Sequence, residues 1–196
     1  MCKYFCKIET ETKFIILMHP KEFKKVKNNT GRFTHKSLPN SELFVGIDFS
    51  NHARVNAIIQ THQSYILFPS KDALNLSMHR PEVCKDKPLA IFLIDATWAC
   101  TKSIFYHSSN LQKLPHMSFT TVRESAYSIK QQPSKEYLST IESVLVVLEL
   151  LDQHGIETIE EDQLKHFLDP FFAMIEYQKK LINNPKSNAI RFKKRK

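Results

Sequence analysis

The chain has 196 residues, 42% of them apolar, and a formal net charge of +8. This is enough for one sizeable core, while two domains would each be undersized, so we expect a single domain over 1–183 and a basic tail over 184–196. No run approaches the roughly 18 to 20 apolar residues of a membrane span, and no secretory signal is seen, so we expect a cytoplasmic protein with no membrane partner.

Short apolar runs rich in β-branched and aromatic residues predict strands that are covered on both faces. They lie at 14–18, 43–47, 65–68, 89–94 and, more weakly, 117–119. Helical patterns lie between or after them, over 51–61, 97–107 and 140–151. This alternation predicts an α/β fold with a mainly parallel sheet flanked by helices.

A last helix is predicted over about 160–183, with Leu164 and Phe167 on its apolar side and a kink at Pro170. The chain contains only three glycines. Neither a P-loop nor a G-x-G-x-x-G dinucleotide loop can be built from them, which excludes the commonest phosphate-binding enzymes.

The four cysteines lie too far apart to form a disulfide framework in a chain of this size. Cys2 and Cys6 have the spacing of half a tetrahedral zinc site, but no second Cys/His pair at finger-like spacing follows them. We therefore expect reduced thiols and no zinc site.

Asp95-Ala96-Thr97-Trp98 follows the fourth apolar run. One interpretation is a helix start, where Asp95 or Thr97 accepts a hydrogen bond from free N–H groups and Trp98 packs in the core. The other is functional, because ligands of open α/β sheets bind at the carboxyl ends of strands. A carboxylate there can bind a hydroxyl group or take a proton.

Ser139-Thr140-Ile141-Glu142 fits a capping box, in which Ser139 and Glu142 bond to each other's backbone N–H groups. The same helix start presents free N–H groups and a positive dipole end. It could therefore also hold the carboxylate of an amino-acid group or a phosphate.

A basic stretch follows the first run, with Lys24, Lys25 and Lys27 upstream of Arg32. It could be a solvated face, or it could bind RNA phosphates while Asn29 and Thr30 read a base edge or sugar. The net charge and a pI of about 9.3 favour an acidic partner, either nucleic acid or an anionic membrane surface.

Six segments in order carry a resemblance to one family. They are His19-Pro20-x-Glu22, Asn29-Thr30-Gly31-Arg32, Leu67-Phe68-Pro69, Leu93-Ile94-Asp95-Ala96-Thr97-Trp98, Ser125-Ala126-Tyr127-Ser128-Ile129-Lys130 and Leu138-Ser139-Thr140-Ile141-Glu142. Together they span about 13–151, and the chain resembles the DTW-domain family of tRNA-uridine aminocarboxypropyltransferases.

The resemblance implies a SPOUT-like fold whose C-terminal part forms a knotted cofactor site. It implies transfer of the 3-amino-3-carboxypropyl group of S-adenosylmethionine to N3 of a tRNA uridine, with 5′-methylthioadenosine as the other product. S-adenosylmethionine is then a co-substrate and tRNA the partner. The implied cofactor loops follow 65–68 and 89–94 and extend over 120–142.

From the resemblance and the strand-end rule we assign site residues as hypotheses. Asp95 is the candidate base, or it orients the cofactor's amino group. The candidate cofactor contacts are Leu67, Pro69, Asp95, Thr97, Trp98, Ser139, Thr140 and Glu142. The candidate RNA contacts are His19, Glu22, Lys24, Lys25, Asn29, Thr30, Gly31, Arg32 and Lys130.

The sequence departs from the family pattern in three places. Family members commonly begin with a four-cysteine zinc cluster, whereas this chain keeps only Cys2 and Cys6. Either the start is truncated or this branch has dispensed with the metal, and we treat 1–12 as the remnant of such a segment. Lys130 stands where an arginine is usual, which replaces a planar fork by a point charge. Ser70 stands where a glycine is common after Pro69.

Two alternatives to this function remain open at the level of sequence. Methyl transfer on the same kind of fold would release S-adenosylhomocysteine, because related folds carry different chemistries. A non-catalytic RNA-binding protein would bind tRNA in a salt-dependent way without turnover.

Overall fold

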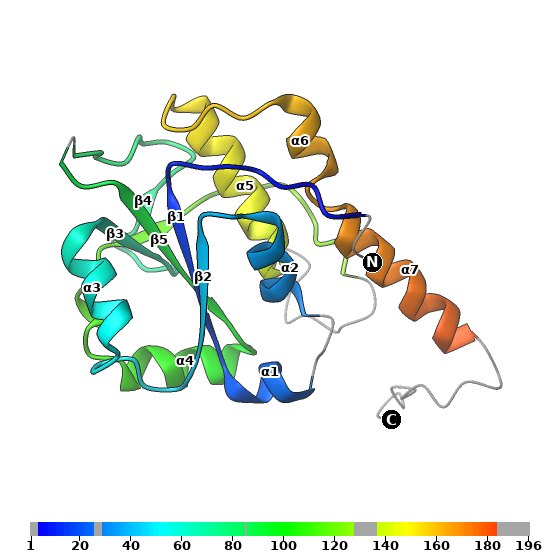
Figure 1. The fold of residues 1–196 in the computed structure, drawn as a ribbon, viewed down its shortest axis with the longest axis horizontal. Helices are drawn as coiled ribbons and strands as arrows, with labels where there is room; N and C mark the ends of the chain where they lie inside the picture. Colours follow the sequence, from blue (N-terminus) through cyan, green and yellow to red (C-terminus); the bar gives the residue numbers. More distant parts are fainter. Residues whose placement is uncertain (1–3, 26–28, 85, 128–136, 184–196) are drawn as a thin grey trace.

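A six-stranded sheet forms the centre of the structure (Figure 1). The computed structural model describes residues 4–25, 29–84, 86–127 and 137–183, with only the backbone described for Lys25 and Trp98. The strand order is β2-β1-β5-β3-β6-β4, and all neighbouring strands are parallel. The predicted α/β fold is therefore confirmed.

The two central strands, β1 (Lys13–Met18) and β5 (Leu89–Asp95), pair along their length, and Met18 lies level with Asp95. Their carboxyl ends therefore meet at one edge of the sheet. The remaining strands are β2 (Ser41–Val45), β3 (Gln63–Leu67), β4 (Leu74–Asn75) and β6 (His116–Ser118).

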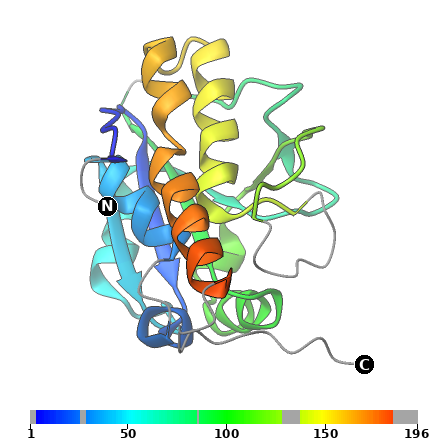
Figure 2. The ribbon, with the colours of Figure 1, turned by 90° about the vertical axis from the view of Figure 1, so that its right-hand side faces the viewer.

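Helices cover both faces of the sheet. The face turned toward the viewer in Figure 2 is covered by α2 (Thr30–Ser37), α5 (Thr140–Gln153), α6 (Glu161–His166) and α7 (Asp169–Asn183). The opposite face carries α3 (Ala53–Thr61), α4 (Trp98–His107) and the 3-10 turn η2 (Leu111–Lys113). Figure 1 shows the short helix α1 (Pro20–Lys25) at the edge toward which the strands point.

The side chains of β5 alternate between two cores. Ile91 and Leu93 pack against α2, α5 and α7, while Ala90 and Phe92 pack against α3 and α4. Because both faces of the strand are buried, its sequence is apolar throughout instead of alternating with polar residues. This burial confirms the interpretation of the apolar run at 89–94.

The prediction of one kinked helix over 160–183 is wrong. The structure contains two helices there, α6 and α7, which are separated at Phe167 and Leu168. Pro170 lies in the first turn of α7. Backbone N–H groups in a first turn have no acceptor within the helix, so proline breaks no hydrogen bond there. Pro170 therefore starts a helix here instead of kinking one. The helices α1 and α2 and the two-residue strand β4 were not predicted.

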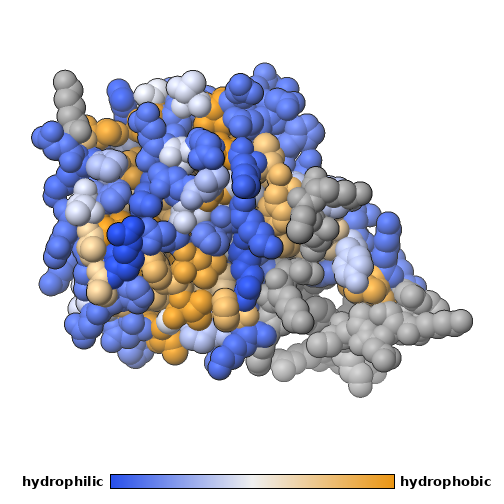
Figure 3. All heavy atoms as spheres, in the orientation of Figure 1, coloured by the Kyte–Doolittle hydropathy of each residue, from blue (hydrophilic) through white to orange (hydrophobic). Residues whose placement is uncertain are grey.

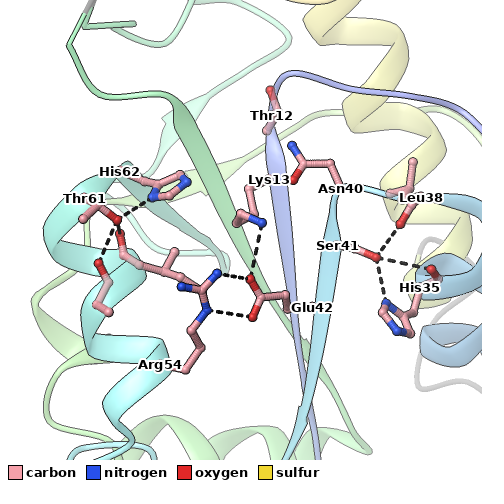
Figure 4. Close-up of polar contacts among 12 residues, drawn as sticks. Thr12, Lys13, His35, Leu38, Asn40, Ser41, Glu42, Arg54, Thr61 and His62 are labelled. Carbon is pink, nitrogen blue, oxygen red and sulfur yellow. Dashed lines mark hydrogen bonds and ion pairs between the residues drawn. The ribbon is translucent and has the colours of Figure 1, made fainter.

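A charged network joins β1, β2 and α3 (Figure 4). The guanidinium of Arg54 donates two hydrogen bonds to the Glu42 carboxylate, at 2.9 and 2.6 Å, and Lys13 donates a third at 3.3 Å. The hydrogen bond from Arg54, more than the charge of Lys13, lowers the pKa of Glu42. This network fixes α3 against the edge strand without taking part in the site described below.

The surface over the edge strand β2 is partly apolar, as Figure 3 shows. Val45 at the end of β2 is 41% exposed, whereas Phe92 in the centre of the sheet is fully buried. These two apolar residues therefore provide a matched pair for testing the packing of the sheet.

We predict that Phe92→Ala lowers the free energy of unfolding by about 3–5 kcal/mol, because it leaves a cavity between the sheet and α4. Val45→Ala should change the same quantity by less than about 0.5 kcal/mol, since its side chain already contacts water. Urea denaturation of both variants measures the difference. Equal effects would contradict the described burial of β5.

Candidate active site

The connections of the chain diverge at the carboxyl ends of β1 and β5. From β1 the chain continues to β2 on one side, and from β5 it passes over β3 to β6 on the other side. Open α/β sheets bind ligands at such a switch point, outside the carboxyl ends of the strands. The end of β5, Asp95, lies at this position.

The Asp95 carboxylate, 4% exposed, receives hydrogen bonds from two distant parts of the chain. The amide of Asn29 donates to Oδ2 at 2.6 Å, and the hydroxyl of Thr140 donates to Oδ1 at 2.6 Å. Asn29 caps α2, and Thr140 is the first residue of α5. Asp95 therefore joins the starts of two helices to the end of the central strand.

Gly31 allows this approach. A Cβ atom on Gly31 would lie 2.7 Å from both Cγ and Oδ2 of Asp95, closer than a side chain can tolerate. Asn29 also accepts a hydrogen bond from the backbone N–H of Arg32 at 3.0 Å, so both ends of its amide are used. Asn29, Thr30 and Gly31 are buried, and this part of the predicted RNA-binding segment positions Asp95. Direct contact of these residues with RNA stays a prediction.

Glu142 ties the loop before α5 to the start of that helix. Its buried carboxylate accepts hydrogen bonds from the backbone N–H of Ala126 at 2.7 Å and from the hydroxyl of Ser125 at 2.9 Å. It also accepts from the N–H and the hydroxyl of Ser139, at 2.8 and 2.6 Å. The predicted capping box is present, and Glu142 extends it to a second segment. Contact of Glu142 with a bound cofactor stays a prediction.

Tyr127 is the last described residue of this loop and lies close enough to Asp95 for the carboxylate to oppose ionisation of its phenol. Burial raises the pKa of the Tyr127 phenol, and the charges of Glu22, Asp95 and Glu142 raise it further. The ring packs edge-on against Phe171 of α7, with centroids 5.3 Å apart. Tyr127 is therefore a neutral phenol among carboxylates at neutral pH.

His19 connects β1 to the site through its backbone, which donates to the carbonyl of Asp95 at 3.2 Å. Its buried ring accepts a hydrogen bond from the N–H of Lys21 at Nδ1, 3.1 Å away. Burial, with a smaller contribution from the charge of Lys21, lowers the pKa of His19. His19 is therefore a neutral residue that immediately precedes α1.

The remaining predicted cofactor contacts that the structure describes lie at the end of β3 and at the start of α4. Leu67 ends β3, and the exposed Pro69 follows it at the same edge of the sheet. Thr97 occupies the N-cap of α4 without a capping bond from its side chain. Trp98 begins α4, whereas Lys130 lies outside the described residues.

The basic residues Lys24 and Lys25 end α1, and Glu22, which is partly buried, lies in its first turn. Arg32, on the first turn of α2, packs over the ring of Phe23. Lys24 and the backbone of Lys25 therefore lie at the edge of the sheet that carries Asp95, while Lys27 of the predicted basic stretch lies outside the described residues.

In the described parts of the chain no group of three or more His, Cys, Asp or Glu side chains could hold a metal ion. Burial raises the pKa of Cys6, and Cys2 lies outside the described residues. None of the described helices is long and apolar enough to span a membrane.

Sequence reasoning missed Asn29 as the partner of Asp95, Glu142 as the anchor of the 125–127 loop, and Tyr127. The Asn29–Asp95 contact joins residues 66 positions apart, and the Thr140–Asp95 contact joins residues 45 positions apart. A short sequence pattern cannot reveal a contact between residues so far apart in the chain. The one available signal was the strand-end rule, which places residues that follow different strands at a common edge.

The fold and the site define an α/β protein with an open parallel sheet and a polar centre at its switch point. Residues 1–179 match the family described as DTW domain. The chain belongs to the DTW domain family.

Curated relatives support this membership. The chain is 29% identical over 178 residues to a protein of Macaca fascicularis named tRNA-uridine aminocarboxypropyltransferase 2. It is 28% identical over 177 residues to the Mus musculus protein of the same name, and each alignment covers 87% of this chain and 56% of the relative. A Drosophila melanogaster protein with that name is 34% identical over 103 residues, 52% of this chain and 39% of the relative.

The chain thus spans about half the length of the curated relatives it matches. No solved structure matches it. The activity named in the relatives is therefore a proposal for this chain.

We predict that Gly31→Ala lowers the free energy of unfolding by about 1–3 kcal/mol, because the new methyl group overlaps the Asp95 carboxylate. A glycine-to-alanine change inside a helix ordinarily raises the free energy of unfolding by about 1 kcal/mol. A decrease in that free energy would therefore indicate the steric overlap with Asp95. In an Asp95→Ala background the penalty should shrink, which a double-mutant cycle by urea denaturation measures. An equal penalty in both backgrounds would show that Gly31 does not act through Asp95.

We predict that His19 makes the fold sensitive to acid. Because its pKa is lowered in the folded state, the unfolded chain binds a proton near pH 6.5 that the folded chain does not. Stability present above about pH 6.5 should therefore fall as the pH is lowered. His19→Asn keeps an acceptor for the N–H of Lys21 and should lose less stability between pH 7.5 and 5.5 in thermal denaturation. An unchanged pH dependence would refute this role.

Proposed function

We propose that this chain is an RNA-modifying transferase that moves the 3-amino-3-carboxypropyl group of S-adenosylmethionine to N3 of a tRNA uridine, releasing 5′-methylthioadenosine. The observation that carries the proposal is the Asp95 carboxylate, held at the switch point by Asn29 and Thr140. The relatives named tRNA-uridine aminocarboxypropyltransferase 2 support the choice of reaction.

The residues at the switch point fit the amino-acid end of the donor, which carries a carboxylate and an ammonium group. Thr140 begins α5, and the first-turn N–H groups of a helix, with their positive dipole end, suit a carboxylate. Asp95 suits an ammonium group through a charge-assisted hydrogen bond. Thr140 donates to Asp95 at 2.6 Å, so the start of α5 and the carboxylate are adjacent, and this adjacency supports their fit to a single amino-acid group.

When bound, S-adenosylmethionine supplies an electrophilic carbon next to its sulfonium. Asp95 has one of two roles toward the incoming uridine: it accepts the N3 proton as general base, or it orients the donor's ammonium group. In either role the carboxylate must keep a fixed direction. Asn29 and Thr140 provide that constraint before the substrates arrive, and a fixed geometry lowers the entropic part of the barrier.

The positive surface beside the site supports tRNA as the acceptor. The net charge is +8, and the exposed Lys21 and Lys24 lie on α1, which follows β1 at the switch point. Phosphate contacts by such residues position an RNA without reading its sequence. A SPOUT-like relation with a knotted C-terminal cofactor site, and a cytoplasmic location, belong to the same proposal.

We predict that Asp95→Asn lowers the rate of methylthioadenosine release by at least about 100-fold, because an amide neither takes a proton nor pairs with an ammonium group. The assay is chromatography of the products after incubation with S-adenosylmethionine and unmodified tRNA. Unchanged product formation would exclude both roles of Asp95. Release of S-adenosylhomocysteine by the wild-type chain would instead identify a methyltransferase.

Thr140 offers a matched control within the same assay. Thr140→Ser keeps the hydroxyl that donates to Asp95 and should keep most of the activity, whereas Thr140→Val removes it at nearly constant volume. The two variants separate loss of the hydrogen bond from loss of packing. Equal activity of the Thr140→Ser and Thr140→Val variants would show that the hydrogen bond from Thr140 does not position the Asp95 carboxylate.

A further inference from the structure

An aromatic ring and a guanidinium form a pair beside the site. Phe23 on α1 is 40% exposed, which is unusual for a large apolar side chain near a polar centre. The guanidinium carbon of Arg32 lies 4.1 Å from the centroid of the Phe23 ring, and Nη2 donates to the Phe23 carbonyl at 3.0 Å. The cation–π contact and the hydrogen bond together hold Arg32 over the ring.

Phe23 and Arg32 are each linked to Asp95 through two successive hydrogen bonds. The N–H of Phe23 donates to the carbonyl of His19 at 3.1 Å, and His19 donates to the carbonyl of Asp95 at 3.2 Å. The N–H of Arg32 donates to Asn29, which donates to the Asp95 carboxylate. His19 immediately precedes α1, and the bond from the N–H of Phe23 to its carbonyl closes the first turn, a rise of roughly 6 Å. The pair therefore lies within about one helical turn of the residues that hold the proposed reacting centre.

The charge around the pair indicates the chemistry of its ligand. Lys21 and Lys24 flank Phe23 on α1 and are exposed, while the intervening Glu22 is partly buried. A ligand that suits this surface has negative charge spaced along it and a flat apolar group to cover the ring. Single-stranded RNA has both, and it is recognised by stacking of its bases on phenylalanine rings and guanidinium planes.

We propose that Phe23, held by Arg32, is a stacking platform for a nucleobase that neighbours the target uridine in the RNA. The inference rests on the proposed function and adds a residue to it that determines how the RNA is held. Stacking on a neighbouring base is the same before and during the reaction, so it contributes to KM more than to kcat. Phe23 thereby acts as a positioning residue, distinct from Asp95.

The first test measures binding alone. The probes are a six-nucleotide oligouridylate and an abasic ribose-phosphate oligomer of equal length and charge, titrated against the full chain at one salt concentration. We expect Phe23→Leu to weaken oligouridylate binding about tenfold, as the loss of one stacked base predicts, and Phe23→Trp to retain it. Binding of the abasic oligomer should be unchanged, because its phosphates contact the lysines.

Phe172 on α7 provides a matched control, because it is a phenylalanine with a similar exposure of 45% on another helix. Phe172→Leu should bind both probes like the wild-type chain. The inference is overturned if Phe23→Leu binds oligouridylate normally, if it loses affinity equally for both probes, or if Phe172→Leu loses as much. Thermal denaturation of each variant excludes unfolding as the cause.

The second test separates this inference from the proposed function. With unmodified tRNA and S-adenosylmethionine, Phe23→Leu should raise KM for tRNA about tenfold and leave kcat within about twofold. A fall in kcat at unchanged KM would overturn the platform and leave the transferase intact. A wild-type chain that binds oligouridylate but releases no methylthioadenosine would instead overturn the proposed function. The binding test of Phe23→Leu against Phe172→Leu would still apply, because it requires no turnover.

Discussion

The two hydrogen bonds from Asn29 and Thr140 to the Asp95 carboxylate are the contact on which the rest of the site depends. They join the starts of α2 and α5 to the end of the central strand, so the carboxylate is fixed by elements from three parts of the chain. A buried carboxylate is costly unless it is hydrogen-bonded, and these donors meet that requirement. Gly31 is the steric condition for the arrangement, since no other residue leaves room for Asp95.

The parallel sheet explains why this contact is possible. Parallel strands end at one edge, and the divergence of the connections after β1 and β5 leaves room there for helix starts and loops. Glu142 adds a second constraint by fastening the 125–127 loop, and with it Tyr127, to the start of α5. The start of α5 reaches Asp95 through Thr140, and α1 with Phe23 reaches it through the backbone of His19, so the proposed donor site and the proposed RNA platform are both connected to the same residue.

The sheet and several helices could be predicted because their signal is local. The apolar run at 89–94 and the helical pattern at 140–151 each reflect burial of the element itself. The helix α2, with the sequence TGRFTHKS, could not, because its glycine and its threonines are weak helix formers and its stability comes from the Asn29 cap and from packing. The partners of Asp95 are likewise fixed by the fold, so the sequence indicated the importance of Asp95 without indicating what holds it.

If this chain transfers the aminocarboxypropyl group to a tRNA uridine through Asp95, cells that lack the chain lose that modification. The decisive experiment is mass spectrometry of tRNA nucleosides from such cells, complemented either with the wild-type sequence or with Asp95→Asn. Aminocarboxypropyluridine should disappear from at least one tRNA and return with the wild-type sequence but not with Asp95→Asn. An unchanged level of that nucleoside, or loss of a methylated nucleoside in its place, would refute the proposed transfer.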